Sequence, residues 1–160
     1  IYVLVEFPFT EVPNYAEKLF FDLQMKGYTP VIAHPERCRP LKDDPRKLYD
    51  FIEKGALAQI TATSVSGKLG EGIQQASLKM IENHLIHFVG SDAHHAENRP
   101  FILKEAYEVI EAELGTSYVE YLKYNATAIL ENKEVKVKAP VQHSTEVKKK
   151  KKHKKFLGLF

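Results

Sequence analysis

The stretch that decides the fold is IHFVGSDAHH, residues 86–95. Residues 86–90 have the character of a β-strand, and they run directly into Ser91, Asp92 and two histidines. In α/β proteins the carboxyl ends of the strands are where active sites are built. A buried strand that ends in a carboxylate and imidazoles therefore predicts an α/β fold with a functional site at its strand ends.

The rest of the chain repeats this alternation of strands and helices. Strand-like runs occupy residues 1–7, 29–34, 56–62 and 85–90. Helical spacing of apolar side chains occupies residues 11–27, 43–55, 70–83 and 100–115, with shorter helices expected at 116–123 and 125–131. Strands that alternate with helices predict a parallel sheet, and nearly continuous apolar strands predict a sheet covered on both faces. Such βα units fit either an open sheet or part of a barrel.

Individual residues indicate where helices begin and which face they bury. Asp44 is the expected N-cap of the helix over 43–55, with Pro45 at its first position. In the helix over 11–27, helical spacing is shown by five side chains, Tyr15, Ala16, Leu19, Phe20 and Leu23.

The composition predicts one globular body and a basic tail. The 160 residues have a net charge of +2, but seven lysines lie within residues 148–155, and without them the net charge would be −5. A mildly acidic body does not favour nucleic-acid binding. The pattern of strands and helices stops after residue 138, so we expect a folded domain over 1–138 and a basic tail over 139–160 that is disordered when free.

The sequence predicts a reducing compartment and no membrane span. A single cysteine, Cys38, cannot form an internal disulfide, which favours the cytosol. No apolar run reaches the roughly 18 residues that a transmembrane helix needs. The chain opens at Ile1 inside the apolar run IYVLVEF and without Met, so we expect that an N-terminal piece precedes it.

Three of the four predicted strand ends carry side chains that can bind a metal ion. Glu6 ends the first strand, His34 follows the second in AHPER, and Asp92 and His94 follow the fourth. Imidazole nitrogens mixed with carboxylate oxygens suit manganese, iron and zinc, and the lack of thiolates argues against a structural zinc site. If the chain stays extended, Asp92 and His94 point the same way. These residues therefore predict a metal site.

Two arginines accompany the predicted ligands and point to an anionic, phosphorylated substrate. Arg37 and Arg99 each follow a histidine of the predicted site, and a guanidinium matches phosphate oxygens in a bidentate manner. A cysteine-dependent phosphatase would have an arginine six residues after its cysteine. Position 44 is an aspartate, so Cys38 does not fit that pattern. Ser64 lies in no GxSxG motif, and we expect the segment around it to be a loop that shapes the site.

These segments together resemble a known family. AHPER followed by SDAHH…NR resembles the polymerase-and-histidinol-phosphatase (PHP) superfamily. VEF…TEVP, GYTPVIAHPER, EKGALAQITA, NRPF…EAYEVIE and YNATAILEN resemble, in order, its bacterial branch of manganese-dependent protein-tyrosine phosphatases. Enzymes of that branch accompany capsular and exopolysaccharide synthesis. The resemblance extends over residues 1–135.

The resemblance implies the C-terminal portion of a distorted (β/α)7 barrel of the PHP type. It also implies a centre of two or three metal ions, with manganese expected and iron or zinc as alternatives. By motif, the metal ligands would be Glu6, His34, Asp92 and His94, and the catalytic phosphate-contacting residues would be Arg37 and Arg99. The family's opening Asp-x-His-x-His segment is not in this chain, so we expect residues 1–160 alone to bind metal poorly and to be inactive.

The implied reaction is hydrolysis of phosphotyrosine on a protein, by water that the metal ions activate. The expected substrate is a membrane-associated bacterial tyrosine kinase, which places the protein in the cytoplasm or at the inner membrane face. The basic tail from Lys148 to Phe160, which ends in apolar residues, could bind an anionic membrane surface. No nucleic-acid partner is expected.

Other functions remain open at this point. A small-molecule phosphoesterase of the same superfamily, such as a histidinol-phosphate phosphatase, would carry the same ligands. A non-catalytic PHP-like scaffold is a second alternative, although intact Glu6, His34, Asp92 and His94 argue against it. A nucleic-acid-binding arm is a third alternative for the basic tail, and the acidic body argues against that.

Overall fold

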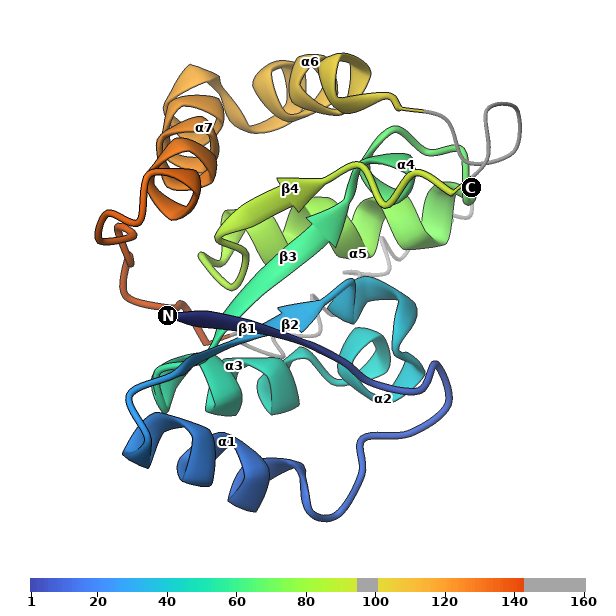
Figure 1. Ribbon diagram of the computed structural model, residues 1–160. Coiled ribbons are helices and arrows are strands. Elements are labelled where there is room, and N and C mark those ends of the chain that lie inside the picture. The colour runs from blue at the N-terminus through green and yellow to red at the C-terminus, as the bar shows by residue number, and fades with distance from the viewer. Residues whose placement is uncertain (95–100, 143–160) are drawn as a thin grey trace, which may run out of the picture.

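The computed structural model describes residues 1–94 and 101–142, which form an α/β domain (Figure 1). Its strands are β1 (Tyr2–Glu6), β2 (Thr29–Ala33), β3 (Leu57–Thr61) and β4 (Phe88–Gly90). Its helices are α1 (Ala16–Met25), the 3-10 turn η1 (Pro35–Arg37), α2 (Arg39–Asp43), α3 (Pro45–Glu53), α4 (Ala62–Val65), α5 (Glu71–Glu82), α6 (Leu103–Leu114) and α7 (Thr116–Leu130).

The described strands form one parallel sheet in the order β1-β2-β3-β4. Glu6 pairs with Ala33, and Thr61 pairs with Gly90, so the last residues of neighbouring strands lie side by side. The prediction of an α/β fold with parallel strands is confirmed. This register brings the segments that follow the strands to a common edge, as Figure 1 shows.

Apolar side chains pack on both faces of the sheet. Ile32 and Ile60 belong to the main core, which also contains side chains of α1, α3, α5, α6 and α7. Val31 and Leu57 lie an odd number of residues from Ile32 and Ile60 on the same strands, so they point to the opposite face. There they form a smaller cluster with Val135. The predicted cover on both faces is therefore confirmed for the central strands β2 and β3.

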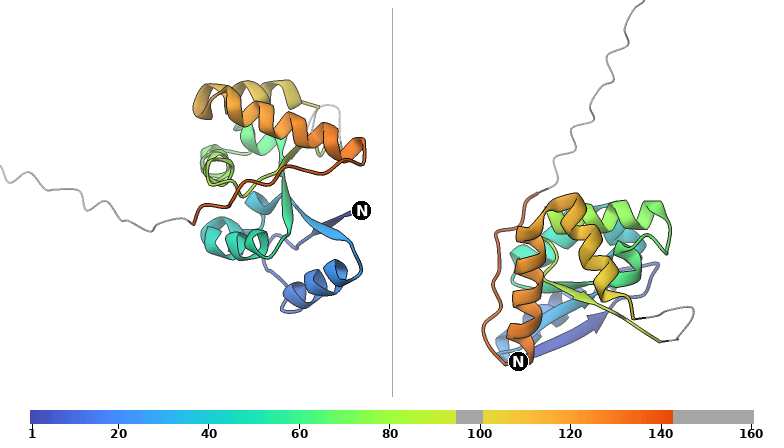
Figure 2. Two further views of the ribbon diagram at one scale, coloured as in Figure 1. Left: turned by 90° about the vertical axis from the view of Figure 1, so that its left-hand side faces the viewer. Right: turned by 90° about the horizontal axis from the view of Figure 1, so that it is seen from above.

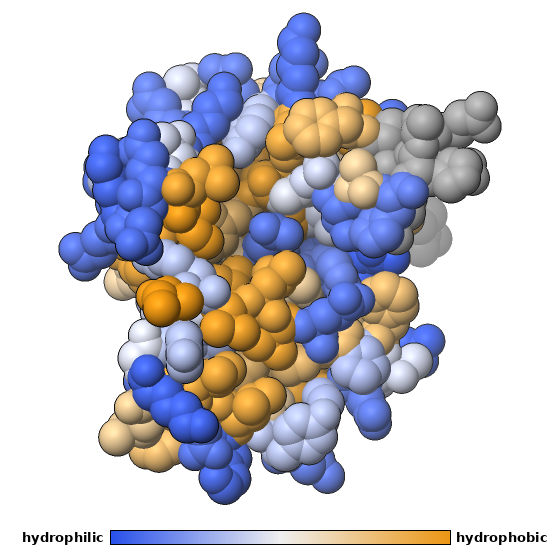
Figure 3. Space-filling model, in the orientation of Figure 1, coloured by the Kyte–Doolittle hydropathy of each residue, from blue (hydrophilic) through white to orange (hydrophobic). Residues whose placement is uncertain are grey.

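The edge strand β1 is not covered on both faces as the sequence predicted. Leu4 remains 60% exposed, and β1 has a neighbouring strand on one side only within the described residues. The side chains of Tyr2, Leu4 and Phe88 help to line a cavity of about 330 Å³ beside α7. Figure 3 shows hydrophobic surface gathered where β1 crosses this face.

Helix α7 corrects the prediction of two short helices. It runs without a break from Thr116 to Leu130, and Asn125 lies fully buried within it. The Asn125 amide donates to the backbone oxygen of Lys136 at 2.9 Å, and its Oδ1 accepts from the Lys136 N–H at 2.9 Å. Because the polar side chain is satisfied by a neighbouring segment, it does not interrupt the helix.

The segment after α7 crosses the domain and is held at several points (Figure 2). Val135 is buried, the backbone of Lys136 is bound by Asn125, and the Val141 N–H donates to the Asn83 oxygen at 2.8 Å. His84 Nδ1 lies 3.1 Å from the Ala139 oxygen. Residues 143–160, which include most of the predicted tail, lie outside the described residues, so the boundary at 138 stays a prediction.

The other helices lie where the sequence predicted them, but their bounds and buried faces differ in part from the prediction. Helix α3 begins as expected, with Pro45 at its first turn and the Asp44 carboxylate accepting from the Arg46 N–H at 3.4 Å. Helix α1 begins only at Ala16, and Tyr15 and Leu19 are exposed, so its buried face is narrower than the spacing indicated. The short elements η1, α2 and α4 were not predicted.

Candidate metal centre

The predicted ligands lie on segments that leave the carboxyl ends of β1, β2 and β4. Glu6 is the last residue of β1, and His34 directly follows β2. Asp92 and His94 follow β4. The site residues are therefore carried by a rigid sheet, which holds their backbones in fixed relative positions.

Glu6 and His34 form the first pair of the site. Glu6 Oε1 lies 3.2 Å from His34 Nε2, with the imidazole buried and the carboxylate largely open to solvent. The His34 backbone is in the left-handed region, with φ of 32°, and its N–H donates to the Gln59 oxygen at 2.7 Å. A non-glycine residue in this region costs conformational energy, and such residues concentrate at functional sites.

Asp92 forms the second pair with His94 and also contacts Arg37. Its Oδ2 accepts from Arg37 Nη1 at 3.1 Å, and its Oδ1 lies 3.4 Å from His94 Nδ1. His94 Nδ1 is also 2.8 Å from the Asp92 backbone oxygen. The φ of Asp92 is 47°, so the chain is not extended here, and the condition under which we expected Asp92 and His94 to point the same way is not met. The two side chains meet because of this turn.

The structure brings the predicted ligands together as two pairs. Arg37 links the two pairs, since it follows His34 by three residues and reaches Asp92. Within residues 1–94 and 101–142, no group of three or more metal-ligating side chains is formed. Arg99 and His95 lie outside the described residues. The donors of the two pairs are imidazole nitrogens and carboxylate oxygens, which fit manganese, iron or zinc.

Glu36 is a buried residue of the site that the sequence analysis left without a role. It is the middle residue of η1, its side chain is fully buried, and its Oε1 accepts from the Ser64 hydroxyl at 2.6 Å and from the Thr61 N–H at 3.1 Å. Burial raises the pKa of Glu36 to about 7, although the hydrogen bond from Ser64 acts in the opposite direction. Glu36 therefore fastens the turn that carries His34 and Arg37 to the end of β3.

The Ser64 contact also corrects the prediction of a loop after β3. Residues Ala62–Val65 form the helical turn α4, and Ser64 is fully buried within it. Its hydroxyl is engaged by Glu36, which leaves no role for Ser64 as a nucleophile. The acidic residue between His34 and Arg37 was the signal in the sequence that could have identified Glu36. Its buried partner, Ser64, could not be identified in this way, because it follows a strand that is distant in the sequence.

Cys38 takes no part in the chemistry. It is buried, with Sγ 3.7 Å from the Glu11 oxygen, and burial raises the pKa of its thiol. A raised pKa disfavours the thiolate, which is the nucleophilic form.

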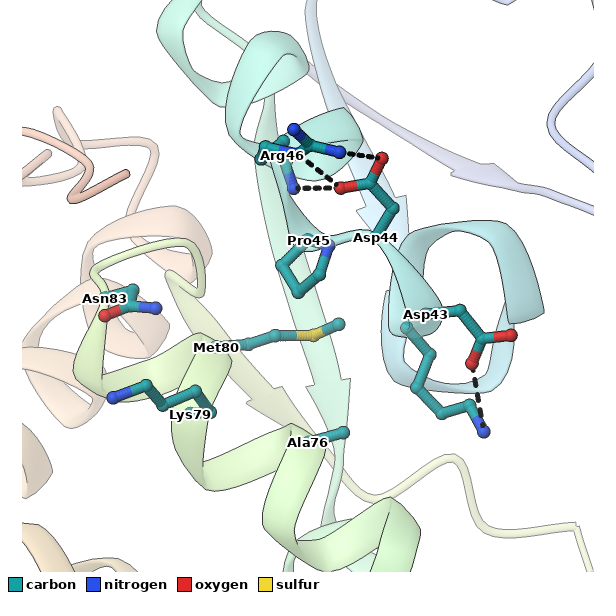
Figure 4. A pocket seen from close by; sticks show the side chains of 9 residues that line it. Asp43, Asp44, Pro45, Arg46, Ala76, Lys79, Met80 and Asn83 are labelled. Carbon is teal, nitrogen blue, oxygen red and sulfur yellow. Dashed lines mark hydrogen bonds and ion pairs between the residues drawn. The ribbon is translucent and has the colours of Figure 1, made fainter. Parts of the chain in front are cut away.

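A separate cavity of about 450 Å³ lies between α3 and α5 (Figure 4). Its charged residues neutralise one another: Arg46 Nε donates to Asp44 at 2.8 Å, and Lys42 lies 3.5 Å from Asp43. Lys79 on its wall is 2.7 Å from Glu82. The cavity shares none of the predicted ligands, so the strand ends remain the candidate site.

Comparison with known proteins gives one consistent result. The family model for capsular polysaccharide synthesis, CpsB/CapC, matches residues 1–131. The chain is 49% identical over 134 residues to the tyrosine-protein phosphatase YwqE of Bacillus subtilis, covering 84% of this chain and 53% of the relative. It is 42% identical over 161 residues to the putative tyrosine-protein phosphatase CapC of Staphylococcus aureus, covering 99% of this chain and 59% of the relative.

A solved structure supports the same relationship. It belongs to a set of crystal structures of YwqE from Bacillus subtilis and CpsB from Streptococcus pneumoniae, described as metal-dependent tyrosine phosphatases. It matches with a TM-score of 0.86 and 47% identity, over 89% of this chain and 57% of the matched chain. The chain thus spans little more than half the length of these relatives. Among the described residues, no helix is both long and apolar enough to cross a bilayer.

Proposed function

Because the chain belongs to the CpsB/CapC family of capsular polysaccharide synthesis, we propose that the full-length protein is a metal-dependent phosphatase that hydrolyses phosphotyrosine on proteins. The observation that carries this proposal is the placement of two ligand pairs and an arginine at the carboxyl ends of neighbouring strands. Relatives named as tyrosine phosphatases favour this activity over a histidinol-phosphate phosphatase or a non-catalytic scaffold.

We propose that residues 1–138 are the C-terminal part of a distorted (β/α)7 barrel. Two observations support a larger sheet: the described part of β1 leaves Leu4 exposed, and the chain spans 53% of the related YwqE. In a closed barrel, further strands would cover this edge and this face. They would also contribute donors beyond the two pairs.

Four residues would hold the metal ions in this proposal: Glu6, His34, Asp92 and His94. Manganese is the expected metal, with iron or zinc as alternatives, and two or three ions in the complete protein. When bound, the ions would supply Lewis acidity and a water nucleophile that is active near neutral pH.

The chain's own residues would bind and orient the phosphoryl group. Arg37 already points into the site through its bond to Asp92, so its guanidinium is positioned to share its donors with a phosphate oxygen. Arg99 would also contact the phosphate, as the family resemblance implies. The leaving tyrosinate has an ordinary pKa of about 10, so it departs without a strong acid. Charge stabilisation by fixed donors is the main contribution expected from the protein.

We propose that the substrate is a membrane-associated bacterial tyrosine kinase in the cytoplasm. The tail from Lys148 to Phe160 would bring the enzyme to an anionic inner leaflet, where each lysine contributes about 1 kcal/mol. Removal of residues 147–160 should abolish co-sedimentation of the full-length protein with liposomes that contain anionic lipid. Undiminished co-sedimentation would exclude the tail as a membrane anchor.

The activity is tested with the full-length protein and two substrates. We expect manganese-dependent release of phosphate from a phosphotyrosine peptide and far slower release from histidinol phosphate. Asp92→Asn removes a proposed ligand charge and should lower the rate by about 100-fold or more, as losses at metal sites do. Lys104→Gln, on the surface of α6, is the matched control. Faster turnover of histidinol phosphate, or activity that persists in Asp92→Asn, would contradict the proposal.

A further inference from the structure

The candidate site has a neighbouring pocket of about 250 Å³. Phe9, Arg37, Arg39 and Lys42 line it. Arg37 belongs to both places, because its side chain lines the pocket while its guanidinium donates to Asp92. The pocket is smaller than the 300–1,000 Å³ typical of sites for drug-sized ligands, so its size suits a single side chain.

The lining of this pocket carries an excess of positive charge. Arg37 is bonded to Asp92, and Lys42 lies near Asp43. Arg39 is exposed, and its guanidinium makes no hydrogen bond or ion pair within the described ranges 1–94 and 101–142. The acidic residue on the described wall, Glu36, is buried and already accepts the hydroxyl of Ser64. Arg39 is therefore the cation that remains available to a ligand.

The pocket is held in place by contacts between two segments. The Arg39 N–H donates to the Phe9 oxygen at 2.7 Å, which ties the loop after β1 to the start of α2. The Arg37 guanidinium lies over the Phe9 ring, 4.6 Å from its centroid, and the His34 ring lies 5.7 Å from the same ring. A fixed pocket loses little entropy when a side chain enters it.

We propose that this pocket binds an acidic side chain next to the phosphotyrosine of the substrate, with Arg39 as the residue that determines this preference. The inference rests on the proposed phosphotyrosine phosphatase function. Phosphate held at Arg37 would place the neighbouring residue of the peptide over Phe9, within reach of Arg39. Acidic phosphopeptides are therefore the substrate class that the site prefers.

The test measures binding of two peptides to the full-length protein. Both carry a non-hydrolysable phosphonate analogue of phosphotyrosine, flanked by glutamates in one peptide and by glutamines in the other. We expect the glutamate peptide to bind more tightly, and Arg39→Gln to reduce this preference about five-fold, as a rim ion pair of about 1 kcal/mol would. Arg39→Glu should reverse the preference. Added salt should weaken it, which a purely structural role of Arg39 would not predict.

Arg46→Gln is the matched control, because Arg46 is an exposed arginine that pairs with Asp44 outside this pocket. It should leave the preference unchanged. Equal preference in the wild-type, Arg39→Gln and Arg39→Glu proteins would overturn the inference. Hydrolysis of a phosphotyrosine peptide is measured in parallel: if hydrolysis fails while the preference remains, the proposed function fails and only the preference of the pocket for an acidic side chain stands. If neither peptide binds while hydrolysis proceeds, the inference fails and the proposed function stands.

Discussion

His87 should make the stability of the protein strongly dependent on pH between about 6.5 and 4. Its side chain is fully buried, its Nδ1 accepts from the Ala58 N–H at 3.2 Å, and its Nε2 has no partner within the described residues. Burial, with a smaller contribution from nearby His84, lowers the pKa of His87 from 6.5 to about 4. The imidazole is therefore neutral in the folded protein.

The sign follows from proton uptake on unfolding. Between pH 6.5 and 4 the unfolded chain binds a proton at this position and the folded protein does not, so acidification favours unfolding. The free energy of unfolding is therefore not reduced by His87 above pH 6.5, and it decreases as the pH falls from 6.5 toward 4. One pKa unit corresponds to 1.36 kcal/mol, so the shift amounts to about 3 kcal/mol at pH 4.

The assay is urea unfolding of the full-length protein at pH 7 and pH 4.5, in the presence of a chelator. His87→Asn is the variant for comparison. The Oδ1 of the asparagine can accept from the Ala58 N–H as the Nδ1 of His87 does, and the asparagine side chain does not titrate. The wild type should lose about 2–3 kcal/mol more than His87→Asn between the two pH values. Equal losses would refute the reasoning, because all other titrating groups are common to both proteins.

Three further outcomes follow from contacts described above. Ser64→Ala should cost about 2 kcal/mol of unfolding free energy in urea titrations, because Glu36 loses its 2.6 Å donor, whereas Ser66→Ala, which removes a part-buried bond at 3.1 Å, should cost less. Asn125→Ala should abolish hydrogen-exchange protection of the Lys136 amide, and retained protection would show that this bond does not hold the segment. Treatment of the full-length protein with a chelator should abolish phosphotyrosine hydrolysis and added Mn²⁺ should restore it, whereas unchanged activity would exclude a metal-dependent reaction.

The strands and most helices were predictable because burial leaves a direct trace in the sequence. β2 and β3 are covered on both faces, so their residues are almost all apolar, and the parallel order of the sheet follows from the helices between them. Helix α4 left no such trace, since its alanine and hydroxyl side chains are as common in loops. The break expected between residues 123 and 125 is absent, and the buried amide of Asn125 is satisfied by the backbone of Lys136 in the segment that follows the helix.

The site was predictable in composition but not in geometry. Residue types and positions at the strand ends indicated four ligands, Glu6, His34, Asp92 and His94. The left-handed backbone of His34 and Asp92 could not be read from the sequence, because both residue types adopt many conformations. The buried bond between Glu36 and Ser64 joins residues 28 apart, and no local pattern specifies such a pair.

The contacts of residues 133–142 determine at which end of the sheet this segment is held. Val141 and Ala139 are fixed to Asn83 and His84, at the amino end of β4, whereas Asp92 lies beyond its carboxyl end. Residues 139–141 are therefore held at the end of the sheet opposite the candidate metal centre. A partner that binds this end of the domain would therefore leave the candidate site, at the other end of the sheet, accessible.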